Sequence, residues 1–188
     1  MGRWEPNARG RLTQAALELY VERGFEQTTV AEIAKLAGLT QRTFFRYFSD
    51  KREVLFWGSA QLQELLVRTV LNAEESAAPI IAVASAIEAG AELLQERRQG
   101  ALLRHRVISA NRELQERELI KLALLGEAIT DALRQRGVPE IAARLSAETG
   151  ITVFKIAFER WIVESKPREM KAIVDELLNE LKVVTGEI

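Results

Sequence analysis

The chain has 188 residues, of which 47% are hydrophobic, so it is long and apolar enough to bury a core. Its formal net charge of −1 excludes a globally basic nucleic-acid-binding protein, and any contact with DNA must come from a local patch. The absence of cysteine excludes disulfides, thiol nucleophiles and thiolate metal sites.

The N-terminal segment predicts short helices with defined starts and stops. Apolar residues at helical spacing from Leu12 to Tyr20 predict the first helix, and Gly24 is expected to end it. The sequence Thr29-Val-Ala-Glu32 predicts a capping box, in which the threonine hydroxyl and the glutamate carboxylate each satisfy a free backbone amide. A second helix therefore begins after Thr29.

Gly38 ends this second helix, and Thr40 is expected to cap a third one over residues 41 to 47. A further capping box begins at Asp50 and predicts a longer helix that continues to about Leu71. Because this segment contains no proline, we expect one rigid rod that joins residues 1–58 to the rest of the chain.

The second and third predicted helices fit a helix-turn-helix window of about twenty residues that begins at Val30. Gly38 then falls at the turn, where a positive φ favours glycine, and Ala34 falls where the two helices cross. The remaining inward positions are all apolar or aromatic: Ile33, Ala37, Leu39, Phe44 and Tyr47. The pattern predicts a helix-turn-helix DNA-binding motif.

The outward face of the third helix carries the residues that can read DNA. A helical wheel places Arg42, Thr43, Phe45 and Arg46 opposite the buried rings. Arginine can bond guanine in the major groove, and Thr or Phe can contact a thymine methyl group. An ordinary solvated helix face is the alternative, but an exposed ring beside two cations argues against it. The predicted DNA contacts are Thr29, Thr40, Gln41, Arg42, Thr43, Phe45, Arg46, Tyr47 and Lys51, the last as a phosphate contact.

Residues 11–55 resemble the DNA-binding domain of the tetracycline-repressor (TetR) family of bacterial transcriptional regulators. The resemblance covers about a quarter of the chain and is carried by Gly24-Phe25, Thr28-Thr29-Val30, Ile33-Ala34, Ala37-Gly38, Tyr47-Phe48 and Lys51. Two positions depart from the family pattern: Arg42 replaces a frequent glycine, and Phe45 replaces a tyrosine whose hydroxyl meets a phosphate.

The rest of the chain predicts helices only, with no alternating strand pattern and no repeat. Breaks are expected at four places: residues 72–79, Gly100, Gly137-Val-Pro139 and Lys166-Pro167. The predicted fold is all-α, with about nine helices. It comprises an N-terminal three-helix helix-turn-helix domain (1–58) and a larger helical domain (59–188), which the resemblance implies binds a ligand and dimerises.

The last two predicted helices are apolar around much of their circumference, which favours a four-helix interface in a homodimer, as in the family. The alternative is that they face the core of a single chain. The predicted interface residues are Val153, Ile156, Ile173, Val174, Leu177, Leu181 and Val184.

An effector pocket lined by aromatic and hydroxyl side chains is one interpretation of the second half, with ordinary core packing as the alternative. Its candidate residues are His105, Thr149, Thr152, Phe154, Phe158 and Trp161. Likewise, Arg104, Arg106, Asn111 and Arg112 could select an acidic ligand or form a solvated face. The single histidine has no second histidine or cysteine to share a metal, so no metal site or cofactor is expected.

No nucleophile with a base and no phosphate-binding loop is evident in the sequence, so an enzyme is not expected. Neither a signal peptide nor a membrane-spanning run is apparent, which favours a cytoplasmic protein without a membrane partner. The sequence therefore predicts a DNA-binding transcriptional regulator that binds a pseudo-palindromic operator as a homodimer. A repressor released by a small molecule is the main hypothesis, and a constitutive regulator or one that senses a protein partner is the alternative.

Overall fold

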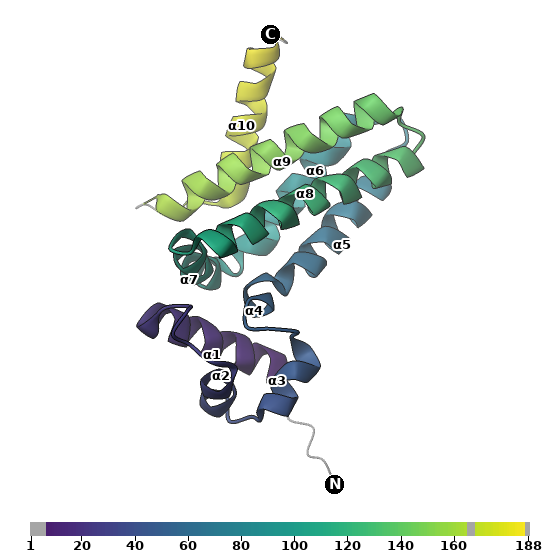
Figure 1. Cartoon of the computed structure of the whole chain (residues 1–188). Helices are drawn as coiled ribbons and strands as arrows, with labels where there is room; N and C mark the ends of the chain where they lie inside the picture. Colours follow the sequence, from purple (N-terminus) through teal and green to yellow (C-terminus); the bar gives the residue numbers. More distant parts are fainter. Residues whose placement is uncertain (1–6, 165–167, 187–188) are drawn as a thin grey trace. The chain divides into compact units, whose positions relative to one another are not determined.

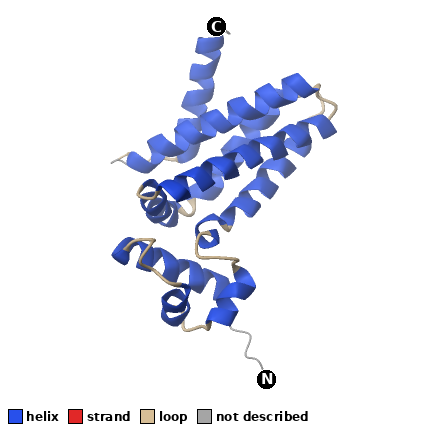
Figure 2. Ribbon diagram, in the orientation of Figure 1, coloured by secondary structure: helices blue, strands red, loops and turns tan. Residues whose placement is uncertain are grey.

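The computed structural model describes residues 7–164 and 168–186, which form ten α-helices joined by loops, with no strand among them (Figures 1 and 2). The predicted all-α fold is confirmed. The helices are α1 (Ala8–Arg23), α2 (Val30–Leu36), α3 (Gln41–Tyr47), α4 (Glu53–Phe56), α5 (Gly58–Leu71), α6 (Pro79–Gln95), α7 (Arg98–Ser109), α8 (Arg112–Gln135), α9 (Glu140–Val163) and α10 (Met170–Thr185). None of these helices is both long enough and apolar enough to cross a membrane.

The chain forms two compact units. The first extends to Gly58 and also includes Leu102–Glu118, whereas the second comprises Ser59–Ala101 and the residues from Leu119 onwards. The segment Leu102–Glu118 therefore groups with the N-terminal unit, although it lies beyond the domain boundary predicted at residue 58. As a result, α7 and α8 each continue along the chain from one unit into the other.

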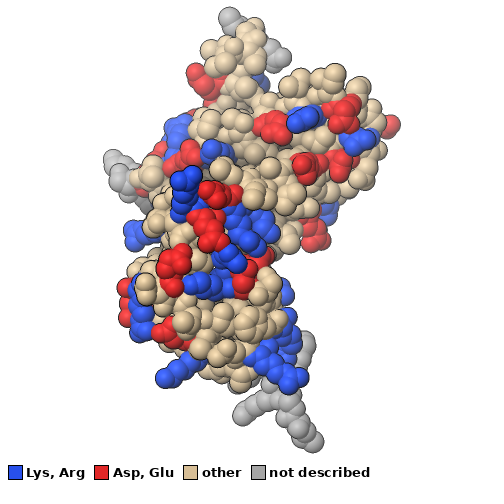
Figure 3. Space-filling view, in the orientation of Figure 1, with Lys and Arg blue, Asp and Glu red and all other residues tan. Residues whose placement is uncertain are grey.

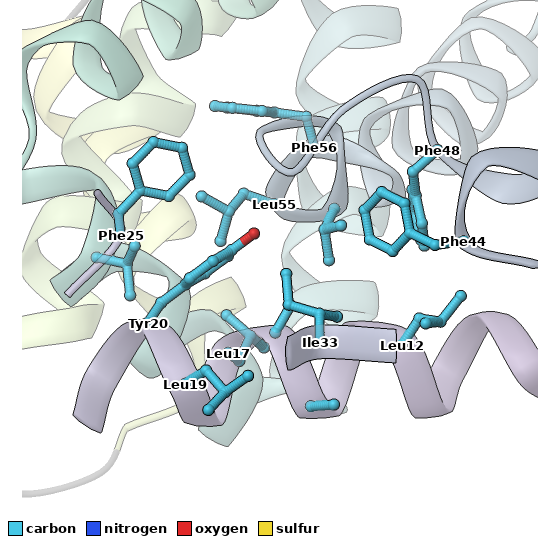
Figure 4. Packing of buried hydrophobic residues seen from close by; sticks show 14 of the residues in the cluster. Leu12, Leu17, Leu19, Tyr20, Phe25, Ile33, Phe44, Phe48, Leu55 and Phe56 are labelled. Carbon is cyan, nitrogen blue, oxygen red and sulfur yellow. The ribbon is translucent and has the colours of Figure 1, made fainter. Parts of the chain in front are cut away.

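The first unit is built around one cluster of buried apolar side chains (Figure 4). Leu12 and Tyr20 come from α1, Ile33 from α2, Phe44 from α3 and Phe56 from α4. The segment Leu102–Glu118, which we call the returning segment, completes the cluster with three residues: Val107, Ile108 and Leu114. The helices that carry the helix-turn-helix motif are thus fixed by a shared core.

Local chemistry sets the helix ends as the sequence predicts. The hydroxyl of Thr29 accepts from the amide of Glu32, while the Glu32 carboxylate accepts from the amide of Thr29 at 2.9 Å. The pKa of Glu32 is lowered, mainly by the hydrogen bond from the backbone amide of Thr29 and then by the one from its hydroxyl. Gly24 and Gly38 have φ values of 87° and 65°, in the region that favours glycine.

The predicted rigid rod from Asp50 to Leu71 is wrong. The helix α4 ends at Phe56, and α5 begins only at Gly58. The three consecutive residues Val54–Phe56 are all buried, which requires core contacts around most of this helical turn. Trp57 separates the two helices, and Gly58, a residue of low helix propensity, is the first residue of α5.

Two of the four predicted breaks are confirmed. Pro79 is the first residue of α6, and a loop with Gly137 at φ 83° separates α8 from α9. The predicted break at Gly100 is wrong, because this glycine lies in the first turn of α7. The chain instead breaks just before Arg98, and it breaks again after Ser109. The predicted break at Lys166-Pro167 lies outside the described residues.

The second unit has a closely packed set of three helices, α6, α9 and α10. Small side chains occupy the α6–α9 contact, and a Cβ atom placed on Gly150 would lie 2.2 Å from Cγ1 of Val83. At the other end, the side-chain oxygen of Gln95 accepts from Nε1 of Trp161 at 2.9 Å and from the amide of Met170 at 3.1 Å. One glutamine therefore joins α6 to α9 and to the start of α10.

Candidate nucleic-acid interface

The short helix α3 separates buried rings from an exposed cationic face. Phe44 and Phe48 are buried with their ring centroids 5.4 Å apart, and Tyr47 is half-buried. On the other side Arg42 and Arg46 are exposed, and the ring of Phe45 is 56% exposed. The structure thus has the two faces that the helical wheel predicts, although Phe48 follows the helix in an extended conformation.

The start of α3 is held by two threonines. The hydroxyl of Thr40 accepts from the amide of Thr43 at 3.1 Å and lies 3.0 Å from the Thr43 hydroxyl. Thr29, Thr40 and Gln41 are exposed, and Thr43 is half-buried. All the predicted DNA contacts on α3 and at its cap therefore belong to one short, locally capped segment.

The arginines of the first unit differ in their partners. Arg23 pairs with Glu32, Arg104 with Glu118 and Arg117 with Glu53. In contrast, Arg42 and Arg46 have no carboxylate partner among the residues that the structure describes. In Figure 3, Lys and Arg side chains project from the first unit at the lower edge of the view. Unneutralised guanidinium groups on an exposed helix suit an anionic partner such as DNA.

Lys51 does not have the environment expected of a phosphate contact. Its ammonium group donates to the carbonyl oxygens of Phe25, Glu26 and Thr28 at 2.8, 3.1 and 3.0 Å. It also lies 4.5 Å from the ring centroid of Phe25. An ammonium group has three N–H donors, and all three are used inside the unit. We therefore assign Lys51 to positioning the loop before α2 instead of contacting a phosphate.

We expect Lys51→Met to lower the free energy of unfolding by about 2 kcal/mol, because three carbonyls lose a charged donor. Chemical denaturation of the full-length protein measures this effect. Lys35→Met, at an exposed position on α2, is the matched control and should change stability by less than about 0.5 kcal/mol. Equal stability of the two variants would contradict the assignment.

Asp50 supports the same region from the other side. Its carboxylate accepts from the amides of Arg52 and Glu53 at 2.7 and 3.0 Å, as expected of a helix cap. Partial burial raises the pKa of Asp50, but these amides and the guanidinium of Arg52 outweigh this effect, so the pKa is lowered overall. The buried hydroxyl of Tyr20 donates to the carbonyl of Lys51 at 2.6 Å, and burial followed by the Asp50 charge raises the pKa of Tyr20.

A further group of contacts holds the returning segment to α4, and sequence reasoning missed it. Arg104 donates from Nε to the carbonyl of Leu55 at 2.6 Å, and its guanidinium lies 5.1 Å from the ring centroid of Phe56. Arg117 pairs with Glu53, and Arg52 pairs with Glu113. The carboxylates and guanidiniums are more than 50 residues apart in the sequence, so no local pattern reveals the pairs.

The residues predicted to line an effector pocket are not gathered in one place. Phe154 and Trp161 are buried in the second unit, and the half-buried ring of Phe158 lies 5.9 Å from that of Trp161. Thr152 is exposed, with its hydroxyl bonded to a backbone carbonyl of its own helix. His105 belongs to the first unit. Core packing, the alternative stated above, accounts for Phe154 and Trp161.

Thr149 lines an open groove of about 590 Å³ among α6, α9 and α10. Ile81 and Leu145 line it too, and both are exposed. Of the predicted interface residues, Leu181 also lines this groove, Leu177 is half-buried, and Ile156 and Val184 are exposed. Exposed apolar side chains therefore occur on α9 and α10 outside the groove as well, at Ile156 and Val184.

Three of the residues predicted at the dimer interface are wrongly placed. Val153, Ile173 and Val174 are buried within a single chain, where they pack in the core of the second unit. Periodicity identifies a helix that is apolar on several faces, but it does not reveal which face a neighbouring helix covers. No group of three or more side chains able to hold a metal ion occurs in the described part of the chain.

Residues 12–56 match the family model for bacterial regulatory proteins of the tetR family. This match covers about a quarter of the chain, and it makes the N-terminal segment similar to the DNA-binding part of that family. Over 81 residues the chain is 33% identical to the HTH-type transcriptional regulator TcmR of Streptomyces glaucescens. That alignment covers 43% of this chain but only 36% of the relative.

Two solved structures match the chain over most of its length. Thermus thermophilus FadR, a TetR-family repressor in complex with lauroyl-CoA, is 26% identical, with a TM-score of 0.56 and coverage of 92% of both chains. Bacillus subtilis FadR in complex with stearoyl-CoA is 22% identical, with a TM-score of 0.60 and coverage of 92% of this chain and 96% of that one. Because the identity to Bacillus subtilis FadR is only 22%, this second similarity supports the fold alone.

Proposed function

We propose that this protein is a DNA-binding transcriptional repressor that binds a pseudo-palindromic operator as a homodimer. The observation that carries the proposal is the exposed face of α3, where Arg42, Phe45 and Arg46 project from a helix anchored by buried rings. Two guanidiniums and one ring are suited to base edges in a major groove. Such a function requires access to the chromosome, so we propose a cytoplasmic location, and none of its steps requires an enzymatic activity.

The proposed effector is a long-chain fatty acyl-CoA. Support comes from Thermus thermophilus FadR, whose structure contains lauroyl-CoA and which aligns with nearly the whole chain. The interior of the second unit is apolar in character, with Leu66, Ile87, Ile129 and Leu133 fully buried. Such side chains suit an alkyl chain better than a polar metabolite. This support favours a small-molecule effector over a constitutive regulator or one that senses a protein.

The first test is selection of bound duplexes from a random DNA library, followed by titration of the selected duplex with and without lauroyl-CoA. We expect lauroyl-CoA to weaken operator binding by about 5- to 150-fold, the range of typical allosteric coupling. Free coenzyme A and free laurate are the controls, and neither should have this effect. Failure to select any sequence would contradict the DNA-binding function.

Calorimetry then tests the coupling in the opposite direction. Because coupling is reciprocal, the operator duplex must weaken lauroyl-CoA binding by the same factor. Equal affinity for lauroyl-CoA with and without DNA would favour a constitutive regulator. If lauroyl-CoA does not bind, the proposed effector class is wrong while the DNA-binding function stands.

Substituting the two exposed arginines separately should relax the sequence preference at defined base pairs. We expect Arg42→Ala and Arg46→Ala each to cost about 1 to 3 kcal/mol of specific binding, if each arginine bonds one base. Selection with each variant identifies the position that loses its preference. A uniform loss of affinity for all sequences would instead indicate that the arginine contacts only phosphates.

A further inference from the structure

We propose that Arg9, at the start of α1, contacts a DNA phosphate from a guanidinium held between two rings. The inference rests on the proposed DNA-binding function, but it assigns a contact outside the helix-turn-helix. The guanidinium carbon of Arg9 lies 5.5 Å from the ring centroid of Tyr47 and 5.7 Å from that of Trp57. Tyr47 ends α3, so the stack joins the start of α1 to the end of the proposed recognition helix.

A second arginine shares the same ring. The guanidinium of Arg46 lies 5.0 Å from the Tyr47 centroid and donates to the Tyr47 hydroxyl at 3.3 Å. This hydroxyl therefore acts as an acceptor within the protein, and its own proton is available for an outside acceptor. Arg9 and the Tyr47 hydroxyl together present hydrogen-bond donors around a single ring, which leaves Arg46 for a base. A phosphate oxygen matches such a set, because it is anionic and accepts only.

The position of Arg9 is unfavourable for folding alone. It lies in the first turn of α1, where the helix dipole disfavours a cation, and this turn contains no acidic residue. Arg9 is exposed and has no carboxylate partner among the residues that the structure describes. Stacking on aromatic rings recovers part of the cost while leaving its N–H groups free to face outward. An anion bound at this place would offset the remainder.

The backbone at this helix start is fixed by two neighbours. Asn7 has a φ of 68°, and its side chain accepts from the amide of Gly10 at 3.2 Å. A Cβ atom on Gly10 would lie 2.3 Å from that side-chain oxygen, so any larger residue would require the Asn7 side chain to move. Arg9 lies between these two residues and is thereby presented from a fixed turn. A preordered side chain loses less conformational entropy when it binds a phosphate.

The test uses the full-length protein, the selected operator and a mixed-sequence duplex, with affinities measured across a range of salt concentrations. Arg9→Gln removes the charge but keeps a side chain that can cover the rings, whereas Arg9→Lys keeps the charge. We expect Arg9→Gln to weaken both duplexes by about tenfold and to reduce the salt slope by about 0.9, the value for one neutralised phosphate. Arg9→Lys should retain most of the wild-type slope.

Arg112→Ala is the control, because this side chain is 91% exposed and belongs to the segment that packs against α4. It should leave the slope unchanged. If Arg9→Gln retains the wild-type slope while the wild-type protein binds DNA, Arg9 does not contact a phosphate and the inference alone fails. If Arg9→Gln weakens binding only by lowering the melting temperature, Arg9 serves folding and the inference also fails. If the wild-type protein binds neither duplex, the proposed function fails instead.

Discussion

Replacing Ile156 and Val184 with glutamate is expected to yield a folded monomer whose affinity for a palindromic operator is at least about 100-fold lower. The two side chains are 40% and 76% exposed in the single chain, so a charge at these positions costs little in folding. In the proposed dimer they would be covered by a second copy, where an unpaired charge is strongly unfavourable. Loss of the second subunit removes the contacts with one of the two half-sites of the operator, which lie about 34 Å apart or a multiple of this.

Light scattering and operator titration measure the two parts of this prediction. The control is Ile120→Glu, because Ile120 is another exposed apolar residue of the second unit but lies on α8. It should leave the protein dimeric. If Ile120→Glu gives the monomer and the double variant remains a dimer, the interface is formed by α8 instead of α9 and α10.

Gly150→Leu is expected to lower the free energy of unfolding by about 3 kcal/mol or more, because the new side chain would overlap Val83 on α6. The higher helix propensity of leucine returns less than about 1 kcal/mol, so overlap dominates. Gly100→Leu on α7 is the matched control, since no atom lies within 4 Å of a Cβ at that position. Denaturant unfolding should show a loss of stability for the first variant only.

A double-mutant cycle makes the cause explicit. Gly150→Ala should destabilise the wild-type protein, yet it should stabilise a Val83→Ala background, in which the overlapping methyl groups are absent. A change of sign between the two backgrounds is the expected result. If Gly150→Ala has the same effect in both, the contact between α6 and α9 does not explain the glycine.

The N-terminal helices could be predicted closely because their determinants are local. Thr29 and Thr40 cap the helices that follow them, and Gly24 and Gly38 adopt the positive φ that the turns require. Each of these signals involves residues within about one helical turn, and such patterns are readable in a single sequence. The exposure of Phe45 followed from the same helical spacing.

The errors arose where distant residues decide the outcome. Lys51 has a favourable position for phosphate, but its charge is used by carbonyls 23 to 26 residues away. The apolar pattern predicts Ile173 at a subunit interface, but the residue is buried within its own chain. An apolar residue has the same sequence signature whether its own chain or another chain covers it. The broken rod also depended on long-range packing, since the core that covers Val54 to Phe56 includes Leu114. Sequence periodicity contains none of this information.

The returning segment Leu102–Glu118 has a practical consequence for protein engineering. A chimera joined at residue 58, which grafts this DNA-binding half onto the regulatory half of a relative, would lose Ile108 and Leu114 and leave apolar side chains such as Phe56 uncovered. A truncated fragment that ends at residue 58 would have the same defect. A DNA-binding unit that is to be transferred to another protein must therefore include both the residues up to Gly58 and the segment Leu102–Glu118. The salt-bridge partners Glu53 and Arg117 are then transferred together.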